Sequence, residues 1–337
     1  MAKQFFIERI PKEVKKLTAF IKRKPIVIFM LGKKLSGKST YAAHLSEATD
    51  GGFSFYSVGD MMRDIESVAN TKFGASLLYK SLRELNINKT KVDNFLEDVK
   101  RIDQKKLYPT DIVYYFLKLM LDTAIEKDSR KSLIIDGFPR SIEQIEYALK
   151  LARFYQKAGM EWFFVEINCP NSVLEARISG RRFCPKCNSS KNIKLLLTKD
   201  VGYDESTKEF YLLCDTPSCK RVRMIRKPGD ELGIKVLEER NKETEAMIEE
   251  CKKRISPLRY IIVYNSLPVE EASSYNEEDF TKEAKLKWNA KDKKVEIEYI
   301  PWIVKDDNGK ECYSRYSEPV AADLIKELFH KLERLTR

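Results

Sequence analysis

The eight residues Gly32 to Ser39, GKKLSGKS, constrain the fold more than any other stretch, because they have the G-x-x-x-x-G-K-S spacing of a phosphate-binding loop. In such a loop, backbone N–H groups surround a phosphate, the lysine reaches the outer phosphates, and a hydroxyl is available to Mg²⁺. The preceding run PIVIFML, residues 25 to 31, is apolar throughout, as a buried parallel strand requires, and TYAAHLSEA after the loop predicts a helix. Strand, loop and helix therefore occur in the order that nucleotide binding needs. The alternative is a surface turn with lysines.

Four further apolar runs predict strands, and helical segments separate most of them. The runs are FSFYSV (53 to 58), SLIIDGF (132 to 138), WFFVEINC (162 to 169) and YIIVY (260 to 264). Strands that alternate with helices form a parallel sheet covered on both faces. The predicted fold class is therefore α/β, a doubly wound parallel sheet.

Composition narrows the class of protein and its compartment. The chain has 337 residues, 43% of them hydrophobic, which is enough for one large domain or two ordinary ones. The net charge of +11 suits a protein that handles polyanions, nucleotides or nucleic acid. No run reaches the roughly 20 apolar residues that span a bilayer, and the N-terminus lacks the order of a secretory signal. We expect a cytoplasmic protein without membrane partners.

Residues 1–24 place apolar side chains at helical spacing between lysines and arginines. This pattern predicts an amphipathic helix that packs on the core and is started or kinked at Pro11. Binding to a membrane surface is the alternative. At the other end of the chain, a hairpin over Lys287-Trp288 and Val295 to Val304 and a helix from about Glu318 to Leu335 are predicted.

The motif DGFPR places Asp136 at the carboxyl end of a predicted strand, the edge where open α/β sheets bind ligands. An acid there can hold Mg²⁺ through water, and Arg140 can neutralise a second phosphate group. A tight turn with a structural acid is the alternative.

Two cysteine pairs, Cys184 with Cys187 and Cys214 with Cys219, interrupt the strand and helix pattern. Two close pairs on successive loops supply a tetrahedral thiolate site that suits Zn²⁺ in a reducing compartment. Four cysteine ligands close the site, so the metal would be structural. The alternative is four unrelated thiols. The three other cysteines, Cys169, Cys251 and Cys312, have no such partners, and we expect them to be core or surface residues.

In four blocks the sequence resembles adenylate kinase and, more widely, the nucleoside monophosphate kinases. The blocks are the phosphate loop, SVGDMMR (57 to 63), DGFPR with Gln144, and ARISGRR (176 to 182) leading into Cys184. The resemblance implies transfer of the γ-phosphoryl group of ATP to AMP with Mg²⁺, and a core with two moving flaps. The implied organisation is an extension (1–24), a phosphate-loop kinase domain (25–337) with a monophosphate flap (57–111) and a zinc lid (180–227), and an insertion of unknown role (265–317).

The same resemblance implies a role for individual residues. Lys38 would bridge the β- and γ-phosphates, Arg177 would lie against the ATP base, and Gln144 would pair with adenine. Arg181 and Arg226 would reach over the transferring phosphoryl group. The implied catalytic residues are Lys38, Asp136, Arg140, Arg181 and Arg226; ATP is bound by Gly32, Leu35, Ser36, Gly37, Lys38, Ser39, Thr40 and Arg177, and AMP by Val58, Arg63, Gly137, Arg140, Gln144, Arg226 and Arg240.

Several positions depart from the family pattern. The family has small residues and proline where Lys33, Lys34 and Leu35 stand, and Val58 replaces its usual threonine. Arg240 and Val236 compete for the arginine expected after the lid. A UMP/CMP kinase, a zinc-ribbon nucleic-acid-binding ATPase and a degenerate kinase kept as a regulator stay open as alternatives. With ATP and AMP as partners, we expect a monomer that does not bind nucleic acid.

Overall fold

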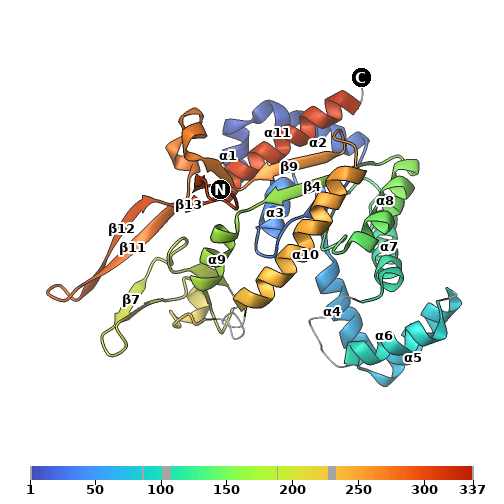
Figure 1. Cartoon of the computed structure of the whole chain (residues 1–337), viewed down its shortest axis with the longest axis horizontal. Helices are drawn as coiled ribbons and strands as arrows, with labels where there is room; N and C mark the ends of the chain where they lie inside the picture. The colour runs from blue at the N-terminus through green and yellow to red at the C-terminus, as the bar shows by residue number, and fades with distance from the viewer. Residues whose placement is uncertain (1, 86, 101–107, 188, 227–232, 336–337) are drawn as a thin grey trace.

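The structure, a computed structural model, describes residues 2–85, 87–100, 108–187, 189–226 and 233–335. A parallel sheet lies at its centre, with helices on both faces (Figure 1). The strand order is β2-β3-β1-β4-β9, and every neighbouring pair is parallel. The strands are β1 (Ile26–Leu31), β2 (Phe53–Ser57), β3 (Ser132–Asp136), β4 (Glu161–Asn168) and β9 (Tyr260–Tyr264). All five correspond to predicted runs, so the predicted α/β fold class is confirmed.

Two hydrophobic cores cover the two faces of the sheet, because side chains alternate along each strand. In β1, Val27, Phe29 and Leu31 belong to one core. Ile26, Ile28 and Met30 belong to the other. All six residues of this strand are buried, which is why its sequence is apolar throughout and does not alternate with polar residues.

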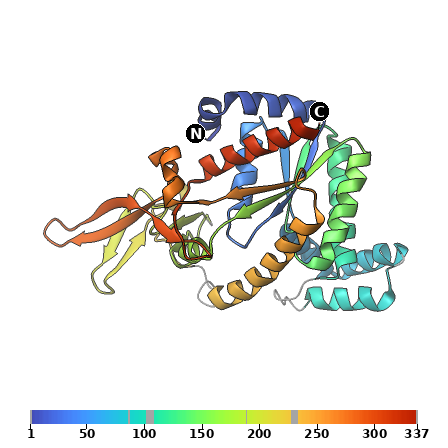
Figure 2. The same ribbon diagram turned by 45° about the horizontal axis from the view of Figure 1, so that its top comes forward.

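Helices from distant parts of the chain build the two outer layers (Figures 1 and 2). One layer holds both ends of the described chain: α1 (Ala2–Arg9), α2 (Pro11–Arg23), α3 (Lys38–Ala48) and α11 (Ser317–Leu335). The other holds α7 (Thr110–Lys127), α8 (Ile142–Lys157) and α10 (Gly233–Arg254). Pro11 begins α2 at a position where the missing N–H costs nothing. The N-terminal segment therefore packs on the core as predicted, although as two helices and with Ile7 exposed.

Two groups of elements project from the core. The first is helical: α4 (Val58–Ala69), α5 (Lys72–Glu84) and α6 (Lys89–Lys100). The second follows α9 (Asn171–Ser179) and contains the cysteines; it consists of β5 (Arg181–Phe183), β6 (Ser190–Asn192), β7 (Val201–Asp204), β8 (Glu209–Leu212) and the 3-10 helix η1 (Pro217–Cys219). Both projections start at the carboxyl edge of the sheet, so they border the phosphate loop.

The segment between β9 and α11 forms a small subdomain. Its base is an antiparallel sheet of β10 (Ser266–Pro268), β14 (Glu311–Ser314) and β13 (Ile303–Lys305), with the 3-10 helices η2 (Val269–Ser274) and η3 (Glu277–Asp279). A long hairpin, β11 (Lys282–Asn289) with β12 (Lys294–Pro301), leaves this base. The first strand of the predicted hairpin began too late, at Lys287, whereas β11 begins at Lys282. Val304 was wrongly included in the second strand, because it belongs to β13 and pairs with Cys312 in β14.

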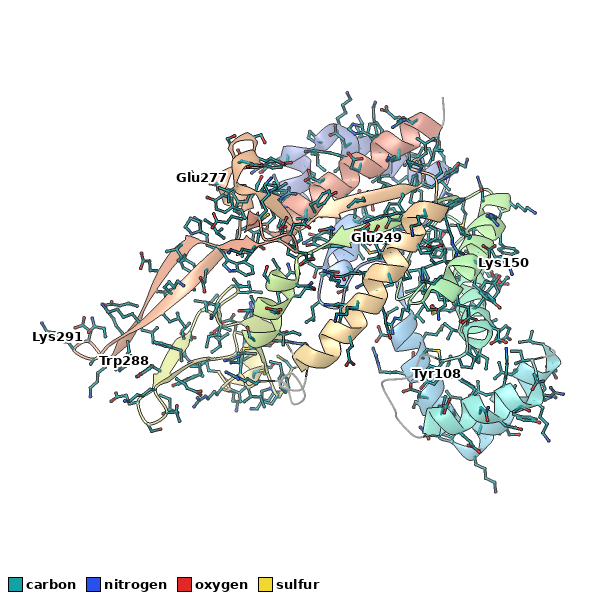
Figure 3. The ribbon with its side chains drawn as sticks, in the orientation of Figure 1. Tyr108, Lys150, Glu249, Glu277, Trp288 and Lys291 are labelled. Atoms are coloured by element: carbon teal, nitrogen blue, oxygen red, sulfur yellow. The ribbon has the colours of Figure 1, made fainter. Side chains whose placement is uncertain are left out.

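The hairpin lies alongside β7 and β8 in both views (Figures 1 and 2). Trp288, labelled in Figure 3, stacks on Tyr203 of β7 with ring centroids 5.0 Å apart. Leu286 packs against the core of the cysteine-containing module, and the Ala284 N–H donates to the Lys194 carbonyl at 2.7 Å. The C-terminal subdomain thus contacts a module that precedes it by about 80 residues in the chain.

Candidate nucleotide-binding site

The loop between β1 and α3 has the backbone conformation of a phosphate nest. Gly32 (φ 146°), Leu35 (φ 69°) and Gly37 (φ 98°) all have positive φ. A Cβ on Gly32 would lie 2.9 Å from the carbonyl oxygen of Ile167, so only glycine fits there. The loop lies between β3 and β4, at the point where the strand order reverses, which is where open α/β sheets bind ligands.

Lys38 occupies the centre of this loop. Its Nζ donates to the carbonyls of Gly32 (2.9 Å) and Lys33 (3.0 Å) and lies 3.8 Å from Oδ1 of Asp136. Burial lowers the pKa of Lys38, an effect that the neighbouring Asp136 partly offsets. The buried ammonium group therefore has two neutral carbonyls and one carboxylate at 3.8 Å as its partners. A phosphate group bound beside it would supply further negative charge.

One carboxylate oxygen of Asp136 has no hydrogen-bond partner among the described residues, although Nζ of Lys38 lies 3.8 Å away. Its Oδ1 is buried and accepts no hydrogen bond from the described part of the chain. Ser39 and Thr40, at the start of α3, line the same cavity as Asp136. Carboxylate and hydroxyl oxygens are the hard donors that Mg²⁺ prefers, with water completing its shell. The residues present therefore fit a magnesium ion bound with a nucleotide.

One cavity of about 1070 Å³ joins the phosphate loop to the two projections. Its wall contains predicted residues from both halves of the expected site: Gly32, Leu35, Gly37, Lys38, Ser39, Thr40, Val58, Arg63, Asp136, Gly137, Arg140, Gln144, Arg177 and Arg181. Ser36 is fully buried beneath the loop, and its Oγ has no hydrogen-bond partner among the described residues.

Two guanidinium groups flank Gly59 at one end of the cavity. A Cβ built on Gly59 would lie 3.5 Å from Nη2 of Arg140 and 3.6 Å from Nη1 of Arg63. Arg63 forms an exposed ion pair with Asp60, a type of contact that stabilises little in water. Arg63 can therefore reorganise around an anion at low cost.

Gln144 is buried, with 3% of its surface exposed, and is therefore not a solvated residue of α8. Its Oε1 accepts a hydrogen bond from the Arg140 backbone N–H at 2.8 Å. Gln144 also lines a second, adjoining cavity of about 300 Å³. Its amide nitrogen thus offers donors at this end of the site, while the oxygen is shared with the backbone of the neighbouring arginine.

Arg177 bridges the phosphate loop to the end of β9. Its Nη1 donates to the Leu35 carbonyl at 2.8 Å, and its Nη2 donates to Oδ1 of Asn265 at 3.2 Å. Asn265 in turn donates to the hydroxyl of Tyr41 at 2.6 Å. Neither Asn265 nor Tyr41 could be predicted as part of the site, because neither belongs to a motif and they lie 224 residues apart in the chain.

The other predicted arginines lie differently. Arg181 lines the cavity, whereas Arg226 is exposed and is not among the described residues that line it. The bridge between Phe183 and Ile225 nevertheless places the two arginines on adjacent segments of the chain. Arg240 and Val236 are in α10, but their side chains lie outside the described part of the structure.

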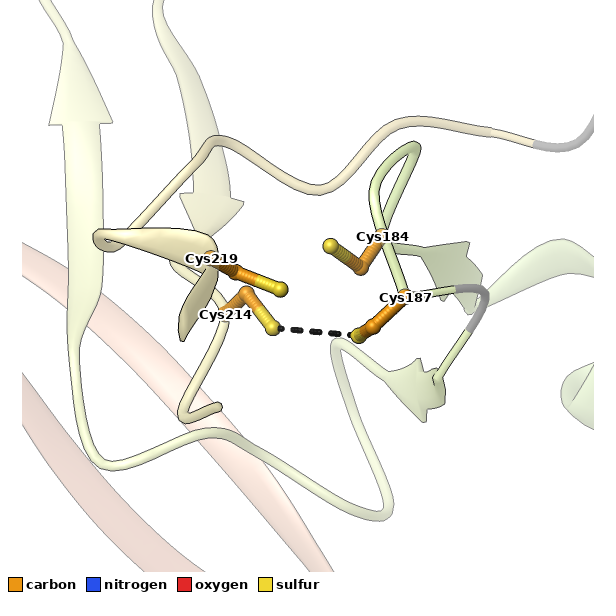
Figure 4. A group of neighbouring side chains, drawn as sticks. All are labelled: Cys184, Cys187, Cys214 and Cys219. Carbon is orange, nitrogen blue, oxygen red and sulfur yellow. Dashed lines mark hydrogen bonds between the residues drawn. The ribbon is translucent and has the colours of Figure 1, made fainter. Parts of the chain in front are cut away.

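The four predicted cysteines meet at the centre of their module (Figure 4). Their Sγ atoms all lie within 4.8 Å of one another, and Sγ of Cys187 is 3.7 Å from Sγ of Cys214. Hydrogen bonding with Ser189 lowers the pKa of Cys187, which favours the thiolate form that binds metal. The donor set is compatible with a closed zinc site. Four unrelated thiols would not converge in this way.

Among the residues that the structure describes, none of the helices combines the length and apolar character that a bilayer-spanning segment requires.

The sequence is similar to known proteins over the part of the chain that contains the phosphate loop. A family model described as an AAA domain matches residues 31–189. An adenylate kinase of Thermotoga petrophila is 29% identical over 204 residues, which cover 60% of this chain and 74% of the relative. An adenylate kinase of Mycoplasmopsis pulmonis is 26% identical over 231 residues, 65% of this chain and 94% of the relative. A third, from Clostridium tetani, is 26% identical over 228 residues.

Proposed function

We propose that this chain, a nucleoside monophosphate kinase related to the adenylate kinases, transfers the γ-phosphoryl group of Mg-ATP to AMP and so forms two molecules of ADP. The observation that carries the proposal is the single cavity lined both by the phosphate loop and by Arg63, Arg140 and Gln144. A nucleotide hydrolase needs only the first of these groups. A kinase needs both, because two nucleotides must lie end to end.

In the proposed reaction, a phosphate oxygen of AMP attacks the γ-phosphorus of ATP, and the bond to the β–γ bridging oxygen breaks. Lys38 neutralises the β- and γ-phosphates, while Arg63 and Arg140 hold the phosphate of AMP. When bound, Mg²⁺ would supply positive charge to the phosphates, and Asp136 is the residue that would hold it. The attacking phosphate is already ionised, so no general base is required. Positioning and diffuse positive charge are what phosphoryl transfer requires.

The remaining arginines act as the flaps close over the two nucleotides. Arg181 already lines the cavity, and Arg226 follows Ile225, which pairs with Phe183 of the same module. We assign both to the transferring phosphoryl group, Arg177 to the ATP base, and Arg240 to the AMP side. Closure excludes water, which strengthens each charge contact and keeps water from accepting the phosphoryl group.

A panel of monophosphates tests the function directly. With Mg-ATP and one of AMP, CMP, UMP or GMP, we expect diphosphate formation, measured by separating the nucleotides, to be fastest with AMP. A clear preference for UMP or CMP would select the pyrimidine kinase instead. Absence of diphosphate from every acceptor, with ATP hydrolysis stimulated by nucleic acid, would select the zinc-ribbon ATPase.

Replacement of Gln144 should weaken the preference for AMP. A good bidentate contact to adenine contributes about 1 to 3 kcal/mol of discrimination, so Gln144→Ala should lower the ratio of kcat/KM for AMP to that for CMP by roughly 5- to 150-fold. Gln144→Glu is the matched variant, because it keeps an acceptor for the Arg140 N–H but loses the donor that faces N1 of adenine. An unchanged ratio in both variants would show that the base is read elsewhere.

A further inference from the structure

Lys33, the second residue of the phosphate loop, is a buried cation whose partners come from outside the loop. Its side chain is 9% exposed. The Nζ atom lies 2.7 Å from Oδ2 of Asp307 and 2.6 Å from Oε1 of Glu245, and it donates to Oδ1 of Asn171 at 3.0 Å. Burial by itself would lower the pKa of Lys33, but the hydrogen bonds with Asp307 and Glu245 outweigh it and raise the pKa. Lys33 is therefore a firmly charged residue held by two carboxylates.

Asp307 belongs to the turn between β13 and β14, and both of its carboxylate oxygens are used. While Oδ2 binds Lys33, Oδ1 accepts the backbone N–H of Asn171 at 2.8 Å, at the N-terminus of α9. A negative charge is stabilised at that end of a helix. Ser172 adds a hydrogen bond from its hydroxyl to the Lys305 carbonyl at 2.6 Å. The turn is thus fixed between α9 and the phosphate loop.

The main chain of Lys33 is itself part of the nucleotide site. Its carbonyl accepts hydrogen bonds from Nζ of Lys38 at 3.0 Å and from the Ser36 N–H at 3.2 Å. Lys33 thus supplies a backbone acceptor to the lysine that meets the phosphates, while its side chain anchors the same residue to Asp307. Of the two carboxylates that bind its ammonium group, Glu245 belongs to α10 and Asp307 belongs to the segment 265–317.

We propose that Asp307 is a positioning residue for the phosphate loop: through the ammonium group of Lys33, the 265–317 insertion holds the loop in its nucleotide-binding conformation without touching the nucleotide. The inference deepens the proposed function and rests on it for the identity of the nucleotide. If the ion pair is lost, alternative loop conformations become populated, and apparent ATP affinity falls in proportion to the competent fraction. AMP binds at the other end of the cavity and is unaffected.

The variant Asp307→Asn tests this with little disturbance, because asparagine has the same shape and still accepts the Asn171 N–H. We expect KM for ATP to rise roughly 5- to 10-fold, while kcat and KM for AMP stay within a factor of about two. Glu311→Gln is the matched control, since it removes an exposed carboxylate from the neighbouring strand β14. A general loss of structure would instead change kcat and both KM values and lower the unfolding midpoint.

Lys33→Met leaves the residues of the turn unchanged and removes the ion pairs with both Asp307 and Glu245, and so tests the idea independently of how Asp307→Asn folds. The double variant should be no worse than Lys33→Met, because the two residues act through each other. Calorimetry measures the dissociation constant of ATP for each variant and does not require that the wild type form any diphosphate. Failure of this inference can therefore be told apart from failure of the proposed function. Wild-type ATP affinity in both single variants, or additive losses in the double variant, would overturn it.

Discussion

Lys38→Ala should abolish phosphoryl transfer while the fold stays intact. Removal of one preorganised donor to developing charge costs on the order of 10²- to 10³-fold in kcat, and Lys38 is the residue placed to reach two phosphates at once. We expect a loss at the upper end of that range or beyond, measured as ADP formed from Mg-ATP and AMP.

The stability expectation for Lys38→Ala follows from the sign of its pKa shift. A lowered pKa means that the charged ammonium is less stable in the folded chain than in the unfolded chain, so the charge costs stability at neutral pH. The variant should therefore keep or raise the midpoint of thermal unfolding. Lys22→Met, which removes an exposed lysine from α2, is the control and should retain full activity. Near-normal turnover of Lys38→Ala would reject the kinase site.

Removal of zinc should melt the cysteine-containing module and depress activity while the α/β core stays folded. The module has a small core in which three of the four cysteines, Cys184, Cys214 and Cys219, are joined by few buried apolar residues, namely Ile193, Leu212 and Met224. Such a core cannot order the segment alone. A structural zinc contributes about 10 to 16 kcal/mol of apparent binding free energy in zinc-finger peptides at pH 7, which is ample for a module of this size.

Metal content and thermal transitions measure this expectation. One zinc per chain, and loss of only the lower-temperature transition after chelation or in Cys187→Ser and Cys214→Ser variants, would support it. Activity is assayed with excess Mg²⁺ restored, so that the chelator acts through zinc alone, and added Zn²⁺ should recover it. Glu205→Gln, which changes an exposed residue of the same module in the turn between β7 and β8, should keep the metal. A metal-free and fully active protein would falsify the proposal.

Much of the core could be predicted because its signals are local. Each strand is a short apolar run that must be buried on both faces, and the loop motif marks where the first strand ends. The two cysteine pairs are also local signals, and their convergence was expected from ligand number alone. The predicted limits of the hairpin were less accurate. Most side chains of β12 are exposed, so the strand has no buried apolar run that would mark its ends in the sequence. The burial of Gln144 likewise depends on how α8 packs in the folded chain, which the position of this residue in the sequence does not reveal.

The sequence by itself therefore determined the parallel α/β sheet, the phosphate loop and the thiolate cluster. Only the tertiary structure decided what holds the loop: Lys33 meets Asp307 across 274 residues, and Arg177 meets Asn265 across 88. The chain has 51 acidic residues, and nothing in the sequence marks which of them will neutralise a given lysine. That choice depends on the path of the segment between β9 and α11, which contacts α9 through Asp307 and Lys305. Ion pairs carry no periodicity, so their partners are fixed only once the backbone has brought the charges together.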